Sequence, residues 1–200
     1  MVDFMTFQIR AARVEDLPRI LGLQRQNLEA AAGSEAATQG FVTVQHDEDT
    51  LRRMHDLAPS VVAEHDGKLA GYALTMLPEA QDLVPVLRPM FEQLSKLSLP
   101  RFYVMGQICV AREHRRSGVF DALYAEHRAL YSGRFDAVVT KISMRNARSL
   151  RAHARVGFVE VHRYRDATDE WSVVAWEFAG GKGPLLDAVG VDGGVRKGTT

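Results

Sequence analysis

A nearly continuous apolar run, Phe102 to Val110, constrains the fold more than any other part of the chain. It lacks the alternation of polar and apolar residues that marks a strand with one face in water, so we expect a strand covered on both faces. A polar turn over 112–118 follows, and apolar residues then recur at helical spacing from Val119 to Tyr131. The central strand therefore predicts a sheet with helices packed on both of its faces.

The other patterns complete an α/β (α+β) fold with a sheet of about six to seven strands. Further strands are expected at 7–11, 60–65, 69–77, 135–142, 159–164 and 171–178, and helices at 16–28, 48–57 and 146–155. Asp66-Gly67 between two apolar runs predicts a tight hairpin. A long insertion, 78–101, has apolar residues at helical spacing, and we expect its helix to begin at Pro85 or Pro89.

Size and composition limit the function classes. The chain has 200 residues, so we expect one domain over 1–178 and a flexible, Gly-rich C-terminal tail over 179–200. Lys+Arg and Asp+Glu are equal at 25 each, without the basic excess usual in nucleic-acid-binding proteins. No apolar stretch approaches the ~18 residues of a membrane span, and the single cysteine, Cys109, cannot form an internal disulfide. These features favour a cytoplasmic protein without a nucleic-acid or membrane partner, and no metal site is expected.

The segment from Arg115 to Phe120 combines the features of a phosphate site. It joins the buried strand to the start of a helix, where backbone N–H groups lack partners and the helix dipole is positive. Such a terminus binds phosphate oxygens. Gly118 has no Cβ and lets a ligand approach the main chain, while Arg115 and Arg116 supply positive charge. The alternative is an ordinary strand-to-helix turn with a solvated basic edge.

A second group of polar residues lies on the helix predicted to begin at Asn146. Helical spacing places an amide, a hydroxyl and an imidazole on one face beside a leucine: Asn146, Ser149, Leu150 and His153. The other side carries three arginines, which we expect in solvent: Arg148, Arg151 and Arg155. The mixed polar face is unusual for a helix that only packs on protein, so it is a candidate ligand face; for Asn146 the alternative is a helix N-cap.

Together these two segments resemble the GCN5-related N-acetyltransferase (GNAT) family. Residues 115–120 resemble the family's Arg/Gln-x-x-Gly-x-Gly/Ala loop, which binds the pyrophosphate of acetyl-coenzyme A (acetyl-CoA), with Phe120 replacing the usual small residue. Residues 146–158 resemble a late family motif of Asn, a small residue, often Tyr, then Gly-Phe. His153 stands where many members carry the tyrosine.

The resemblance implies a fold, a co-substrate and a set of contacts. The fold would be a GNAT-like mixed, mostly antiparallel sheet, splayed between its fourth and fifth strands. Acetyl-CoA would be the co-substrate, held in part by free N–H groups of the splayed strand at 106–110. The implied cofactor-binding residues are Ile108, Cys109, Val110, Arg115, Arg116, Ser117, Gly118, Val119, Phe120, Asn146, Ser149 and His153.

The implied reaction is direct acetyl transfer to an amine in a ternary complex, without an acyl-enzyme. Cys109 lies inside a strand, where a buried, inert thiol is expected rather than a nucleophile. His153 is the general-acid candidate, since an imidazole with a pKa near ~6.5 can donate a proton; the alternative is a hydrogen-bonded histidine packed beneath the cofactor. Gln107 stands where some members carry a catalytic glutamate, and its amide is no base. Glu64 is the base candidate, with His65 as an alternative, and either could instead simply end a strand at the surface.

The acceptor is expected to be a primary amine of a small molecule, a peptide or a protein. The expected walls of its site are residues 40–43 and the insertion at 78–101, which would serve either as a lid or as an apolar homodimer face. A function from another class stays open, a catalytically silent acyl-CoA binding or sensing domain, motivated by Gln107 and by the missing tyrosine.

Overall fold

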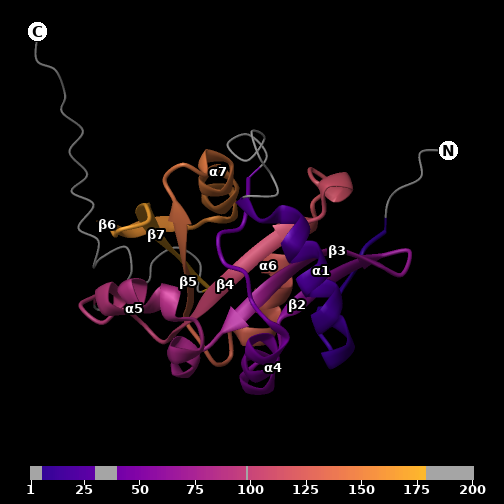
Figure 1. The fold of residues 1–200 in the computed structure, drawn as a ribbon, viewed down its shortest axis with the longest axis horizontal. Coiled ribbons are helices and arrows are strands. Elements are labelled where there is room, and N and C mark those ends of the chain that lie inside the picture. The colour runs from indigo at the N-terminus through magenta and orange to yellow at the C-terminus, as the bar shows by residue number, and fades with distance from the viewer. Residues whose placement is uncertain (1–5, 30–39, 98, 179–200) are drawn as a thin grey trace, which may run out of the picture.

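The computed structural model describes residues 6–29, 40–97 and 99–178 of the chain (Figure 1). The helices are α1 (Leu17–Asn27), α4 (Glu48–Leu57), α5 (Arg88–Leu94), α6 (Val119–Tyr131) and α7 (Ala147–Val156). The strands are β1 (Gln8–Ala11), β2 (Val61–His65), β3 (Lys68–Met76), β4 (Phe102–Val110), β5 (Ala137–Ser143), β6 (Val159–Arg165) and β7 (Glu170–Glu177). The predicted tail, 179–200, lies outside the described residues.

Local sequence signals explain where several elements begin and end. Asp47 caps α4, because its side chain accepts a hydrogen bond of 2.7 Å from the Thr50 N–H. The insertion's helix, α5, has Pro89 in its first turn, which confirms one of the two predicted starts. Asp66 and Gly67 turn β2 into β3 with positive φ angles of 48° and 72°.

All described strands form one sheet in the order β1-β2-β3-β4-β5-β7-β6. Neighbouring strands are antiparallel except β4 and β5, which run parallel and pair only over residues 102–104 and 137–139. Beyond those residues the two strands separate, and the remaining length of β4 has no strand partner on that edge. The predicted mixed, mostly antiparallel sheet with a central splay is therefore confirmed.

Helices cover both faces of the sheet, and each face has its own apolar core. Figure 1 looks onto the face covered by α1, α4 and α5, with α6 behind the sheet. One core lies between the sheet and the helices α1, α4 and α5, and it includes the strand residues Tyr72 and Val104. The other core lies between the sheet and α6, and it includes Ala73 and Tyr103, which are adjacent in sequence to Tyr72 and Val104. This alternation is the period-two pattern of strands buried on both sides.

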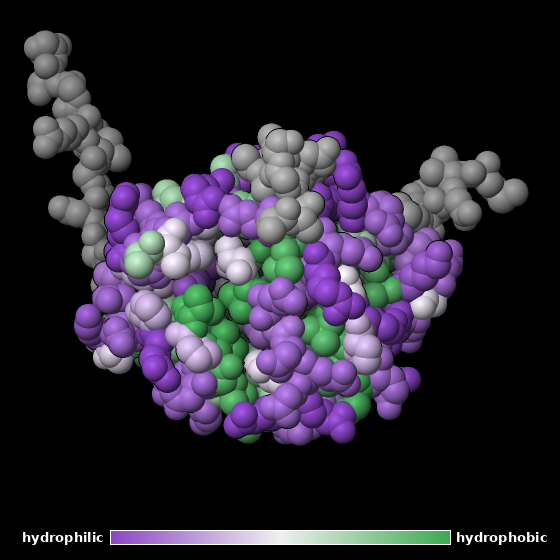
Figure 2. All heavy atoms as spheres, viewed as in Figure 1, coloured by the Kyte–Doolittle hydropathy of each residue, from purple (hydrophilic) through white to green (hydrophobic). Residues whose placement is uncertain are grey.

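The insertion packs its apolar side chains into the chain's own core. Its buried apolar residues are Ala80, Val84, Leu87, Met90, Phe91 and Leu94. They therefore already have packing partners within the chain. On the face that carries α1, α4 and α5, Figure 2 shows mostly hydrophilic side chains with smaller hydrophobic patches between them. Within the described residues, no helix has both the length and the apolar character needed to cross a membrane.

Candidate cofactor-binding site

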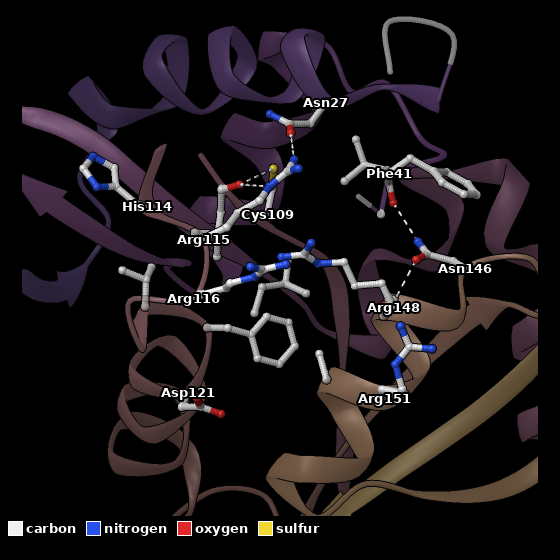
Figure 3. Close-up of a pocket in the computed structure, with 18 of the residues that line it drawn as sticks. Asn27, Phe41, Cys109, His114, Arg115, Arg116, Asp121, Asn146, Arg148 and Arg151 are labelled. Carbon is white, nitrogen blue, oxygen red and sulfur yellow. Dashed lines mark hydrogen bonds between the residues drawn. The ribbon is translucent and has the colours of Figure 1, made fainter. Parts of the chain in front are cut away.

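A cavity of about 690 Å³ opens between the end of β4 and α7, beyond the point where β4 and β5 separate (Figure 3). Its walls are the end of β4, the turn into α6, the exposed side of α7 and the segment that follows residue 39. The lining residues are Asn27, Gly40, Phe41, Val42, Ile108, Cys109, Val110, His114, Arg115, Arg116, Gly118, Val119, Phe120, Asp121, Asn146, Arg148, Ser149, Arg151, Ala152 and Arg155. The cavity thus brings together most of the predicted cofactor-binding residues from two distant parts of the sequence.

The free edge of β4 supplies backbone hydrogen-bonding groups to this cavity. The Ala111 N–H donates to the Ala70 carbonyl at 2.8 Å, and this bond shows which residues of β4 point their backbone N–H and C=O groups toward β3. In such a ladder, alternate residues point their N–H and C=O groups to opposite edges. Ile108 and Val110 therefore turn these groups away from β3, into the gap that β5 leaves open. Two amide donors and two carbonyl acceptors line this wall.

The turn before α6 has the shape of a phosphate cradle. Gly118 is the N-cap of α6 with φ at 86°, a left-handed conformation that L side chains rarely adopt. A Cβ added there would meet no described atom within 4 Å, so the cavity reaches the backbone. The first-turn N–H groups of α6 have no intrahelical acceptors and carry the positive end of the helix dipole. Ser117 does not line the cavity; its hydroxyl donates to the His114 carbonyl.

Arg115 connects the cradle to α1. Its guanidinium donates to the Asn27 side-chain oxygen at 2.7 Å and, more weakly, to the Val110 carbonyl at 3.4 Å. Figure 3 shows this side chain between β4 and α1, close to Cys109. Asn27 was not predicted as a site residue, because its position at the end of an amphipathic helix carries no sequence signal for a ligand. Arg115 is thus both a charge at the cavity wall and a brace between two elements.

α7 presents a different face to the cavity from the one predicted. Asn146 and Ser149 line it as expected, and Asn146 also caps the helix and donates to the Phe41 carbonyl at 3.1 Å. The three arginines expected in solvent line the cavity as well: Arg148, Arg151 and Arg155. Leu150 and His153 instead turn into the core beneath α7. Arg151 and Arg155 are exposed as expected and Arg148 is half-buried, but all three border the cavity because α7 turns its basic side toward it.

His153 lies beneath the cavity rather than in its wall. It is 2% exposed, and both ring nitrogens have partners. Nδ1 donates to the Ser149 carbonyl at 2.8 Å, so Nε2 is the nitrogen that accepts from the Tyr124 hydroxyl at 2.7 Å. Burial lowers the pKa of His153 from 6.5 to about 4. This geometry matches the alternative of a histidine packed under the cofactor and does not favour a general acid.

Phe120 fills the place where the family loop usually has a small residue. It lines the cavity, and its ring packs edge-on against Tyr124 and His153 with centroids 5.2 Å apart in each case. The side chain therefore leans onto the aromatic core between α6 and α7. Gly118, Val119 and Asp121 of the same turn line the cavity beside it.

Cys109 lines the cavity but is poorly suited to nucleophilic attack. The side chain is buried, and burial raises the pKa of the thiol from 9.0 to about 12. The thiol is therefore protonated at neutral pH, whereas the thiolate is the nucleophilic form. This agrees with the expectation that Cys109 is inert.

A buried polar network joins β4 to α1 and to segment 40–46. The Gln24 side-chain oxygen accepts from the His46 N–H at 2.8 Å, so its amide nitrogen donates to His46 Nδ1 and to the Gln107 oxygen, each at 2.8 Å. Gln107 also accepts from the Tyr72 hydroxyl at 2.6 Å and donates to the Val44 carbonyl at 2.8 Å. These two backbone contacts fix the orientation of both amides. Sequence reasoning missed this network, since Gln24, His46 and Tyr72 look like isolated polar residues in the sequence.

Glu64 is held in an ion-pair network away from the cavity. Its carboxylate contacts Arg19 at 3.0 Å and Arg10 at 3.1 Å, and Arg10 also pairs with buried Asp16. The hydrogen bond from Arg19 holds the pKa of Glu64 below its usual value. His65 packs its ring against His114 instead of lining the cavity. The structure does not bring either base candidate to the end of β4.

Comparisons with known proteins agree with this geometry. The family model for the acetyltransferase (GNAT) family matches residues 24–158. A search of curated proteins found no match. The ribosomal-protein-S18-alanine N-acetyltransferase from Escherichia coli is a similar solved structure, at 14% identity and a TM-score of 0.62, over 86% of this chain and 94% of that one.

Two other solved structures show the same fold. The Salmonella typhimurium protein yncA, solved with its cofactor acetyl-CoA, is 18% identical over 89% of this chain and 97% of that one, with a TM-score of 0.58. An N-acetyltransferase from Staphylococcus aureus Mu50 is 16% identical over 86% of this chain and 99% of that one, with a TM-score of 0.57. Since the family model covers most of this chain, the chain belongs to the acetyltransferase (GNAT) family, whose co-substrate is acetyl-CoA.

Proposed function

We propose that the protein transfers an acetyl group from acetyl-CoA to a primary amine of a small molecule or peptide, by direct attack in a ternary complex. One observation carries this proposal: the edge of β4 that has no strand partner and the turn before α6 line the same cavity. A long ligand with phosphates at one end and amides at the other matches that sequence of donors. Acetyl-CoA supplies the activated acetyl group when it is bound.

The residues of the chain divide the work of binding and alignment. The first turn of α6, Arg115 and Arg116 hold the diphosphate. The Ile108 and Val110 backbone groups hold the pantetheine arm and donate to the thioester oxygen as negative charge develops there. Fixed alignment of this kind accelerates a reaction between two bound molecules without any acid or base.

We assign neither the deprotonation of the amine nor the protonation of the leaving thiolate to His153 or Glu64. His153 has its only ring N–H committed to the Ser149 carbonyl, and Glu64 is ion-paired outside the cavity. The acceptor amine would reach the site as the free base and attack the thioester carbonyl, its proton would leave to water, and the coenzyme A thiolate would depart and take a proton from water. We infer a supporting role for His153, which holds Tyr124 and the first turns of α7 in place.

The silent acyl-CoA sensor is the second candidate. Gln107 in place of a carboxylate favours it, together with the burial of His153. A sensor would bind acetyl-CoA in the same cavity and release no coenzyme A thiol with any amine. The two candidates therefore differ in turnover and not in affinity.

The test is release of coenzyme A thiol from acetyl-CoA in the presence of an amine panel containing polyamines, amino acids and peptides. We expect at least one amine to give thiol release with a matching amount of N-acetylated product. The Cys109→Ala variant should keep this activity within severalfold, and mass spectrometry of enzyme with acetyl-CoA alone should show no acetyl-cysteine. Tight binding without turnover on a broad panel would support the sensor instead.

A further inference from the structure

A second, much smaller cavity lies at the opposite end of the free edge of β4 from the turn before α6. Its volume is about 30 Å³, room for one small polar group. The Thr140 hydroxyl donates to the Met105 carbonyl at 2.9 Å and bridges β4 and β5 here, directly beyond their last paired residues. We call it the small cavity. Its walls are residues 104–106 of β4, Thr140 and Lys141 of β5, residues 43–44, and Leu87 and Met90 of the insertion.

The small cavity lies where the reacting end of bound acetyl-CoA would be. The turn before α6 follows the end of β4, so a donor with its phosphates there runs back along Val110 and Ile108, and its thioester lies toward Gln107. The small cavity begins at the next residue, Gly106. An amine that attacks the thioester therefore has this cavity beside it, and a short group on that amine can enter it. Its place suits a contact with the acceptor, not with coenzyme A.

Lys141 supplies a positive charge to the small cavity, and its side chain is half-buried. The ammonium lies over the Trp171 ring, 4.1 Å from the centroid, and donates to the Val86 carbonyl at 3.2 Å. It forms no ion pair with any carboxylate of the residues that the structure describes. An ammonium has three donors, so two of them have no acceptor within that part of the chain.

The acidic side chains nearest to this ammonium are committed elsewhere. Asp166 and Asp169 act on Lys141 from outside ion-pair distance and favour its charged form. Asp169 pairs with Arg145 at 2.9 Å. The Asp166 carboxylate accepts from the Thr168 N–H and hydroxyl at 2.8 Å and 2.6 Å. Burial outweighs both carboxylates and lowers the pKa of Lys141 from 10.5 to about 8, so an anion bound beside it would stabilise the ammonium.

We propose that Lys141 binds a carboxylate of the acceptor, so that the preferred acceptors are small amines carrying a carboxylate, such as amino acids. The inference rests on the proposed function and narrows its acceptor from primary amines in general. A half-buried ammonium repels a second cation, so polyamines are disfavoured at the same place. The competing account is that Lys141 only fastens the insertion to the sheet, through Val86 and Trp171.

The first experiment measures the acceptor preference of the unchanged protein. Release of coenzyme A thiol is followed with amino acids, with the same amino acids as carboxamides, and with polyamines. We expect kcat/KM for the amino acids to exceed that for their carboxamides at least tenfold, and the polyamines to be poorer still. Equal values for acid and carboxamide, or a preference for polyamines, would overturn the inference.

The second experiment removes the charge. Lys141→Met keeps a long apolar side chain against Trp171, and we expect kcat/KM for amino acids to fall at least tenfold while that for carboxamides changes less than threefold. Lys96→Met, at an exposed lysine after α5, is the matched control and should change neither. An equal loss for acid and carboxamide would mean that Lys141 only fastens the insertion, and the carboxylate contact would be refuted. Urea unfolding midpoints of both variants show whether folding is affected.

A binding measurement reads the same contact without turnover. Calorimetry on the protein, with and without coenzyme A, gives dissociation constants for the amino acids and their carboxamides. We expect the amino acids to bind at least tenfold more weakly to Lys141→Met, and the absence of any such difference would overturn the inference. If acetyl-CoA is never turned over and this difference is still present, the proposed function fails and the carboxylate contact stands, so the two failures are distinguishable.

Discussion

Gly118 is the N-cap of α6, at the end of the cavity where we propose that the diphosphate binds. Its positive φ suits glycine, and open space lies where a side chain would start. Gly118→Glu should abolish acetyl-CoA binding, because it strains the turn and places a carboxylate among the phosphates. Gly133→Glu is the matched control, since Gly133 is also open to solvent and lies after the far end of α6. Calorimetry should give an unchanged dissociation constant for the control and no measurable heat for Gly118→Glu; wild-type affinity in Gly118→Glu would contradict the cradle.

His153 resembles a catalytic residue in the sequence but is buried in the fold, and we propose a structural role for it. His153→Phe removes the acceptor for the buried Tyr124 hydroxyl and the donor to the Ser149 carbonyl. An orphaned buried polar group costs about 1–3 kcal/mol, so the free energy of unfolding should fall by that amount. The maximal turnover rate should change only severalfold, whereas loss of a general acid typically costs 10²–10⁴-fold.

The check on His153 combines urea unfolding with steady-state kinetics. In His153→Phe/Tyr124→Phe the orphaned hydroxyl is gone, so part of the lost stability should return. A hundredfold fall in turnover with unchanged stability would restore His153 as the acid.

At the level of elements, the sequence predicts which segments are helices and strands better than which way they face. Helical spacing placed α7 within a residue of its observed bounds, because Asn146 and Gly157 are strong capping signals. The same spacing could not say which side of α7 meets the core. That choice depends on the aromatic rings of Phe120, Tyr124 and Phe158, which come from other elements and receive His153.

Segment 40–46 is an element whose position depends on side chains of two others. Its Val44 carbonyl and His46 N–H bond to Gln107 and Gln24, and Val42 exchanges backbone hydrogen bonds with the end of α1. None of these contacts follows from a local pattern, so this wall of the cavity could be expected only as a loop. The segment nevertheless borders the cavity through residues 40–42.

Gln24→Leu tests this anchoring. The buried His46 N–H then has no acceptor, and the Gln107 side-chain oxygen loses the hydrogen bond that Gln24 donates to it. The free energy of unfolding should therefore fall by about 1–3 kcal/mol. Amide hydrogen exchange at residues 41–46 should accelerate more than exchange in β4. Gln26→Leu, on the exposed side of the same helix, should alter neither quantity. Uniform acceleration across the sheet would mean that Gln24 supports the whole fold rather than this segment.

Across the whole molecule, three buried histidines share one arrangement. In each, one ring nitrogen accepts a hydrogen bond from a buried side chain. His46 Nδ1 accepts from the Gln24 amide, His127 Nδ1 from the Tyr103 hydroxyl, and His153 Nε2 from the Tyr124 hydroxyl. For His127 the assignment follows because Nε2 donates to the Ala73 carbonyl. Protonating any of these rings places a hydrogen on the accepting nitrogen and breaks that bond. Burial lowers the pKa of each histidine from 6.5 to about 4.

Folding stability should therefore collapse on mild acidification. Between about pH 6.5 and 4 the unfolded chain binds protons at these histidines and the native chain does not, so stability is complete above pH 6.5 and is lost as the pH falls. Three such protons give a slope approaching about 4 kcal/mol per pH unit near pH 5, against a typical total of about 5–15 kcal/mol. Urea unfolding at pH 7.5, 6.5 and 5.5 measures the slope.

Two variants check the assignment of this slope to the buried histidines. His127→Gln should reduce the slope by about a third, while His162→Gln, in the half-exposed edge strand β6, should leave the slope unchanged. A flat profile down to pH 5 would show that these rings protonate within the folded core, and the shared arrangement would then carry no pH dependence.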